Sequence, residues 1–139
     1  MFSIRLPRPL ASLSVAAVLG LGLFITHSSL AADKDAEVKK IDQDALFNDY
    51  LGMNFPSAEQ KLQKAIKTCG ASGCSPNVLA TVHRDLGMVY VAGMNDAAKG
   101  KSEFVAALKA DPSITLDKDL TTPEAQKAFD EAKAEVGAG

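Results

Sequence analysis

The chain has 139 residues, a formal net charge of −2 and a hydrophobic fraction of 47%. This length provides for one small domain, and the slight acidic excess argues against nucleic acid, which is bound by neutralising phosphates with Lys and Arg. Trp is absent and only 6% of residues are aromatic, so much of the core has to be built from aliphatic side chains.

Residues 1–32 have the pattern of a cleaved secretory signal peptide. Arg5 and Arg8 precede an uncharged apolar stretch at 10–25, and small residues near position 30 predict cleavage after Ala31 or Ala32. An uncleaved membrane anchor is the alternative, but the stretch is shorter than the ~20 residues that span a bilayer. The sequence therefore predicts a periplasmic or secreted protein with no membrane span after cleavage and a single domain over 33–139.

Removal of Arg5 and Arg8 with the signal leaves 13 of the 15 basic residues against 17 acidic ones, a formal charge of −4. The first residues of the mature chain, 33–37, are charged and predicted to be frayed. Apolar spacing then predicts a helix over 38–53 and a second from about 58 to 68, opened by Ser57 and Gln60 in the pattern of a capping box.

The next segment, "CGASGCSPN", predicts a connection because it is rich in Gly, Ser and Pro. In an exported protein Cys69 and Cys74 are expected to form a disulfide. A redox-active pair of cysteines more often has the spacing C-x-x-C. A structural zinc site needs four ligands, and the two cysteines and His83 would supply only three. We expect no metal and no other cofactor.

Helices are also predicted over about 77–92 and 96–110, and a fifth opens with Thr122 as N-cap and Pro123 at its first position. An extended loop precedes this last helix. No segment shows sustained alternation of apolar and polar residues, so the sequence predicts an all-α fold of antiparallel helix pairs.

The two predicted helix pairs repeat one another. Leu46 and Tyr50 recur 40 residues later as Leu86 and Tyr90, and three core positions recur 42 residues later. These are Ala58, Leu62 and Ala65 in the first copy and Gly100, Phe104 and Ala107 in the second. Such a repeat predicts a helix-turn-helix unit used twice.

The second copy, with Leu86-Gly87-x-x-Tyr90 and Gly100-x-x-x-Phe104-x-x-Ala107 before a closing Pro112, resembles a tetratricopeptide repeat. The resemblance covers residues 77–112 well and 38–68 loosely. Phe47 stands where that family has Gly, and the turn of the second copy has one extra residue. The resemblance implies two stacked hairpins, with the fifth helix as a cap.

The resemblance also implies a non-enzymatic scaffold of the cell envelope that binds a protein or peptide along the first helix of each hairpin. The residues at those positions are Ile41, Asp44, Asn48 and Leu51 in the first copy, and Thr81, Arg84, Met88 and Val91 in the second. Arg84 could anchor a carboxylate there, and Met88 could adapt to an apolar side chain. The alternatives are that these residues pack against the fifth helix or a second copy, as in a self-associating subunit of an envelope complex or a homodimer.

Two stretches that look like catalytic motifs lack residues that those motifs require. "HRDLGMVY" at 83–90 begins like a kinase catalytic loop, but Tyr90 stands where the magnesium-binding Asn is required. "GKS" at 100–102 lacks the earlier Gly of a phosphate-binding loop, because residue 95 is Asn. One His in the mature chain supports no Ser-His-acid triad, and Asp117 and Asp119 fit a solvated loop better than a calcium site. The sequence therefore predicts no enzymatic activity.

Overall fold

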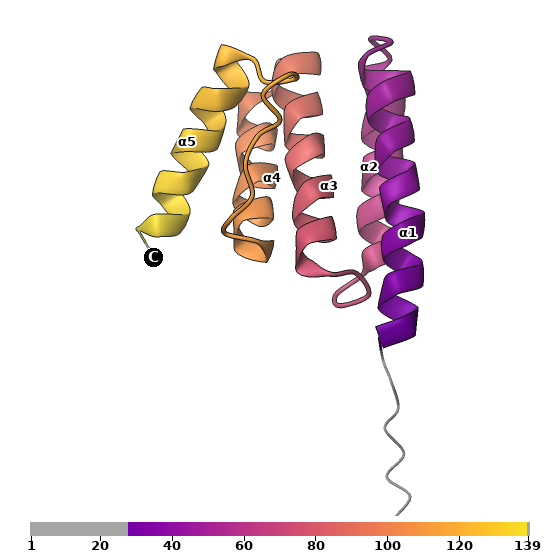
Figure 1. Cartoon of the computed structure of the whole chain (residues 1–139). Coiled ribbons are helices and arrows are strands. Elements are labelled where there is room, and N and C mark those ends of the chain that lie inside the picture. The colour runs from indigo at the N-terminus through magenta and orange to yellow at the C-terminus, as the bar shows by residue number, and fades with distance from the viewer. Residues whose placement is uncertain (1–27, 139) are drawn as a thin grey trace, which may run out of the picture.

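The computed structural model describes residues 28–138, with side chains from residue 32. Within this range the chain is all-helical with no strand, which confirms the predicted fold class (Figure 1). The α-helices are α1 (Ser28–Asp44), α2 (Phe55–Cys69), α3 (Pro76–Met88), α4 (Ala97–Ala110) and α5 (Pro123–Gly137), and π-helical segments η1 (Ala45–Tyr50) and η2 (Val89–Gly93) extend α1 and α3.

Two predicted helix starts are wrong. Residues 33–37, expected to be frayed, lie inside α1, so that helix begins before the predicted cleavage positions. The N-cap of α2 is Asn54, and Ser57 lies within the helix, so the expected capping box with Gln60 does not form. Thr122 and Pro123 open α5 as predicted, with the Ala125 N–H donating to Thr122 Oγ1. The rest of the signal-peptide prediction, at residues 1–27, lies outside the described residues.

The two hairpins, α1–η1–α2 and α3–η2–α4, share the geometry of their turns. Each first helix ends in π-type bonds, from Leu51 N–H to Leu46 O and from Met94 N–H to Val89 O, both 3.0 Å. Each turn then passes through one residue of positive φ, Met53 at 59° and Asn95 at 53°. These two residues are 42 positions apart, like the core positions of α2 and α4, so the repeat seen in the sequence is also a repeat of structure.

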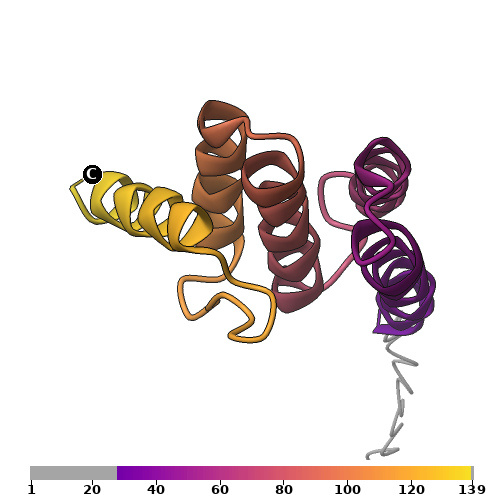
Figure 2. The same ribbon diagram turned by 90° about the horizontal axis from the view of Figure 1, so that it is seen from above.

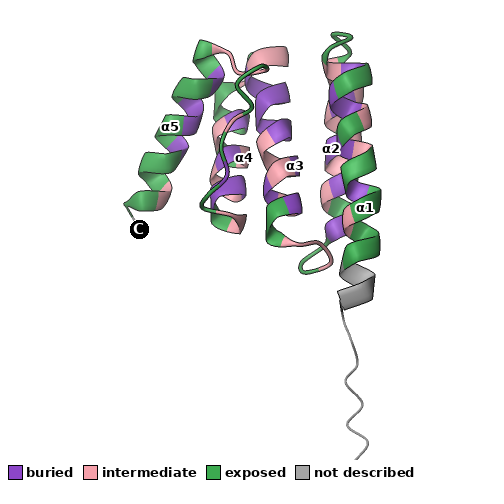
Figure 3. Ribbon diagram, in the orientation of Figure 1, coloured by how far each residue is buried: buried purple, intermediate pink, exposed green. Residues whose placement is uncertain are grey.

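Helix α3 is shared between two hydrophobic cores, which explains why it is apolar on more than one face. Its residues Val78, Val82 and Leu86 belong to the first core, with α1 and α2. On another face, Ala80 and Met88 belong to the second core, with α4 and α5. The hairpins are thus joined by burial of residues on two faces of α3; Figure 3 marks buried residues in purple.

Helices α3 and α4 cross in close contact at a pair of glycines. A Cβ placed on Gly87 would lie 2.5 Å from the ring of Phe104, and one placed on Gly100 would lie 2.9 Å from the carbonyl oxygen of Gly87. In the first copy Phe47 takes the place of Gly87 and is 66% exposed. The first hairpin therefore lacks the glycine contact and turns this aromatic side chain to solvent.

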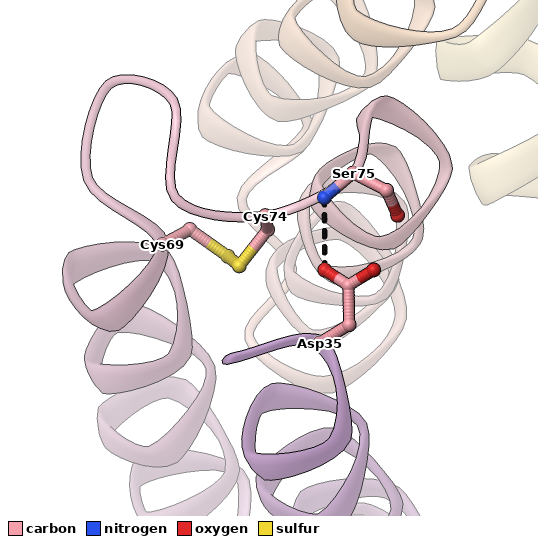
Figure 4. The surroundings of a disulfide bond; sticks show 4 residues. All are labelled: Asp35, Cys69, Cys74 and Ser75. Carbon is pink, nitrogen blue, oxygen red and sulfur yellow. Dashed lines mark hydrogen bonds between the residues drawn. A yellow bond between two sulfur atoms is a disulfide. The ribbon is translucent and has the colours of Figure 1, made fainter. Parts of the chain in front are cut away.

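The disulfide between Cys69 and Cys74 closes the loop between the hairpins (Figure 4). It is confirmed as predicted and leaves no free cysteine in the described chain. Next to it, the Ser75 N–H donates to Asp35 Oδ1 at 2.8 Å. Since Ser75 is the N-cap of α3, this hydrogen bond links the first half of α1 to the start of α3.

The segment between α4 and α5, residues 111–122, which we call the strap, runs back along the molecule beside α3 and α4 (Figures 1 and 2). Because the strap makes the return crossing, α5 runs in the same direction as α4. Ile114 of the strap is buried in the second core, with Leu116 and Leu120 packed against it. The predicted extended loop is therefore a part of the core.

Candidate protein-interaction surface

The predicted binding residues do not form one surface. Met88 and Val91 are 2% and 5% exposed and belong to the second core, so they are not available to a ligand. This prediction was wrong because the strap and α5 cover the face of α3 that the family resemblance left open. Thr81 is partly buried, and its hydroxyl donates to the Asn77 carbonyl of its own helix.

Arg84 is held by this chain. Its guanidinium donates to both oxygens of Asp85, at 2.7 and 2.9 Å, and its Nη1 reaches the carbonyl oxygen of Thr115 in the strap at 3.4 Å. The predicted carboxylate anchor is thus occupied by the neighbouring Asp85, and the strap lies where a peptide was expected.

The candidate residues of the first hairpin face a different direction. Asp44 pairs with Lys61 of α2 and accepts a hydrogen bond from Asn48 at 2.6 Å. Asp44 and Ile41 line a cavity of about 400 Å³ on the α1–α2 face, together with three lysines. Arg84 and Thr81 lie instead on α3, so the two halves of the predicted site are not brought together.

An exposed apolar surface lies at the turn end of the hairpins, and we call it the apolar tip. It consists of Phe47, Leu51, Met53 and Met94, exposed by 66%, 53%, 79% and 38%. The two turns meet at this end, because a Cβ on Gly93 would lie 2.4 Å from the ring of Phe55. The tip is at the opposite end of the hairpins from the disulfide loop, and its α1–α2 turn is exposed in Figure 3.

Met53 is the most unusual residue of the apolar tip. Its φ of 59° is in the left-handed region, which a non-glycine residue rarely enters and which Asn tolerates better. The second hairpin has Asn95 at the equivalent position. Met53 therefore combines an unfavourable backbone conformation with exposure of a large apolar side chain, and such strain is typical of functional positions.

The charged residues close to the apolar tip in sequence are paired with each other. Lys61 lies 2.5 Å from both Asp44 Oδ2 and Asp49 Oδ2, and Lys99 lies 3.6 Å from Asp96. These pairs leave the tip without a lysine that is directed at an anionic ligand. What the tip offers chemically is apolar contact area.

Of the four residues of the apolar tip, the sequence-based candidates included only Leu51, although a signal for the others was present. The turns "LGMNFP" and "AGMND" both carry a methionine among Gly and Asn, where a turn normally has only small or polar residues. A methionine in each of two equivalent turns would have identified this end of the molecule as an apolar surface.

The residues of the kinase-like motif make contacts within this chain. His83 Nδ1 lies 2.6 Å from Glu103 Oε2 of α4, and Arg84 pairs with the buried Asp85. No group of three metal-ligating side chains occurs among the described residues. A cavity of about 520 Å³ between the strap and α5 is lined by threonines, Gln126 and two lysines, with no nucleophile paired to a base.

Comparison with known protein families, with curated proteins and with solved structures found no match to this chain. The molecule is thus defined by its own structure as an all-α protein with a repeated helical hairpin. Between residues 28 and 138, no helix is long and apolar enough to cross a membrane.

Proposed function

We propose that this protein is an exported, non-enzymatic scaffold of tetratricopeptide-like hairpins that binds another protein of the cell envelope through its apolar tip. The observation that carries the proposal is Met53, which holds a large apolar side chain 79% exposed on a left-handed backbone. Neither feature stabilises the folded chain by itself, so another source of favourable free energy accounts for both. Burial of the Met53 side chain in a partner protein provides it.

Export is supported by two separate features. The signal-like sequence of residues 1–32 directs the chain out of the cytoplasm. The Cys69–Cys74 disulfide suits an oxidising compartment.

The chemistry of the apolar tip defines the partner. Exposed apolar side chains on two adjoining turns suit an apolar groove on the other protein. The side chains of the tip include Phe47 and two methionines, and aromatic residues and Met are enriched at the centres of protein interfaces. The partner groove is therefore apolar and carries no isolated charge, because burying one without a counter-ion would cost too much.

Site-specific photo-crosslinking in the producing cells tests this proposal. A crosslinking amino acid at Asn48, exposed beside Phe47 on η1, should give one discrete adduct with another protein. The same amino acid at Ala134, exposed on α5 far along the chain, is the control and should not give that adduct.

The decisive variant is Met53→Asn. Asn tolerates the left-handed conformation better than Met, so thermal stability should be unchanged or raised, while the adduct from Asn48 should fall several-fold. Phe47→Ser in the same protein should reduce it further. An adduct that persists in both variants would refute the role of the tip, and an adduct with the mass of two copies of this chain would favour the self-associating subunit.

A further inference from the structure

Two buried aspartates and a half-buried arginine come together where the hairpins meet. Asp42 of α1 is 6% exposed and Asp85 of α3 is 1% exposed. Arg84 binds Asp85 through two hydrogen bonds, so this pair is neutral. Asp42 is then a further carboxyl group in the same site without a cation of its own.

Asp42 sits in a position that would normally be apolar. Val38, Asp42 and Ala45 are spaced i, i+4 and i+7 on α1, and the two flanking residues are completely buried. Oδ1 of Asp42 is buried without a hydrogen-bond partner. It borders a cavity of about 30 Å³ lined by Lys39, Val78, Thr81 and Val82, which is room for about one water molecule.

Ionisation of Asp42 would place two buried carboxylates beside one guanidinium. Burial and the neighbouring Asp85 raise the pKa of Asp42 to about 8, and Arg84 only partly opposes this. Burial likewise raises the pKa of Asp85, against the effect of Arg84, and Asp117 of the strap adds to the increase. Hydrogen bonding between the two carboxyl groups adds to the increase in the pKa of Asp42 and lowers the pKa of Asp85, so a proton on Asp42 would serve both groups.

We propose that the Asp42–Asp85 pair is a proton-binding site that couples the two hairpins. With the proton bound, Asp42 links α1 to the Arg84–Asp85 pair of α3, and through Arg84 to Thr115 of the strap. Without it, like charges face each other across the α1–α3 contact, and the first hairpin is held less firmly to the rest of the molecule. The site senses alkaline pH.

The direction of the pH effect follows from proton binding. The folded protein binds this proton more tightly than the unfolded chain, in which the pKa of an Asp is near 3.9. Its stabilising effect is complete below that value and is lost as pH rises through about 8. The charged groups that face this pair are Arg84 of α3 and Asp117 of the strap, and Lys39 borders the cavity beside Asp42.

The variant Asp42→Asn tests the proposal, because Asn is a neutral isostere that can still donate to Asp85. Between pH 6 and pH 9 the melting temperature of the wild-type protein should fall by several degrees, and that of Asp42→Asn should change much less. Asp44→Asn is the matched control, two residues away on the same helix. Lys61 lowers the pKa of Asp44. The melting temperature of this variant should therefore fall between pH 6 and pH 9 as much as that of the wild type.

Two further measurements locate the effect. Carbon NMR of the Asp carboxyl groups should show a titration above pH 6 that disappears in Asp42→Asn; because the pair is coupled, the signal can appear on either residue. Hydrogen exchange, corrected for its intrinsic pH dependence, should increase in α1 and α2 at pH 9 more than in α4 and α5. The proposal would be overturned if every Asp titrated below pH 5. It would also be overturned if the melting temperatures of the wild type and Asp42→Asn changed equally with pH.

Discussion

Gly100 sets the distance between α3 and α4. A Cβ at this position would lie 2.1 Å from Val91 Cγ2 and 2.9 Å from the Gly87 carbonyl oxygen, well inside normal contact distance. Ala is favoured over Gly by about 1 kcal/mol in a helix interior, but overpacking a core costs about 1–3 kcal/mol. Because the new Cβ would lie this close to its neighbours, we expect Gly100→Ala to lower the free energy of unfolding, measured by urea titration, by up to about 2 kcal/mol.

Gly137→Ala is the control for this prediction. Gly137 is the last residue of α5, and a Cβ there would meet nothing within 4 Å, so this variant should be as stable as the wild type or slightly more so. If Gly100→Ala behaves in the same way, the close crossing of α3 and α4 does not require glycine.

The burial of single residues was predictable only in part. Val78, Val82 and Leu86 have the i, i+4, i+8 spacing of one helix face, and they do face a core. Spacing could not show that Met88 and Val91 face a second core, because that core includes residues of the strap and α5, which follow much later in the sequence. The same is true of Asp42. The sequence shows that it lies in an apolar stripe, but its place next to Asp85 depends on how the two hairpins stack.

Among the elements, the predicted helices of the second hairpin agree with the structure more closely than those of the first. Helix α4 begins and ends within a residue of the predicted range, because Asp96 caps it and the Lys99 N–H donates to this side chain. Helix α1 was predicted to start later, because residues 33–37 are charged and have little apolar pattern. Their helical state is supported by a contact distant in sequence, from Asp35 to Ser75.

The disulfide is an element-scale constraint between α2 and α3. The two cysteines are five positions apart, and closure of so short a loop in the unfolded chain corresponds to about 2 kcal/mol of stability. We expect a reductant to lower the free energy of unfolding by about this amount, as measured by urea titration followed by circular dichroism. Helix content before unfolding should stay the same, since both helices have buried apolar faces.

A Cys69→Ala, Cys74→Ala double variant separates loss of the disulfide from other effects of the reductant. Its stability should match that of the reduced wild type and should not respond to reductant. If reduction leaves the wild type as stable as before, the Asp35–Ser75 hydrogen bond and the packing of Cys69 are sufficient to position the hairpins.

At the scale of the whole molecule, the closure of the two hydrophobic cores bears on whether this chain needs to associate with itself. Two hairpins are few for a repeat array, which usually needs about three units or a cap. Here α5 and the strap cover the second core, with Phe129 1% exposed and its ring 5.3 Å from that of Phe104. The cores are thus closed within one chain, and a second copy is not needed to bury them.

A covalent dimer joined by a disulfide would need a free cysteine on each copy. The disulfide is internal to the chain, and Cys69 and Cys74 are the only cysteines in the sequence, so a covalent dimer requires that this bond be broken.

We therefore expect light scattering to give the mass of a monomer across a wide range of concentrations, both with and without reductant. Met53→Asn should give the same mass, because its side chain contacts no second copy. A mass that rises with concentration in the wild type but not in Met53→Asn would show that the tip binds a second copy, and the protein would then be a self-associating subunit. A rise in both proteins would place the contact elsewhere, with the lysine-lined α1–α2 face beside Ile41 as the first region to examine.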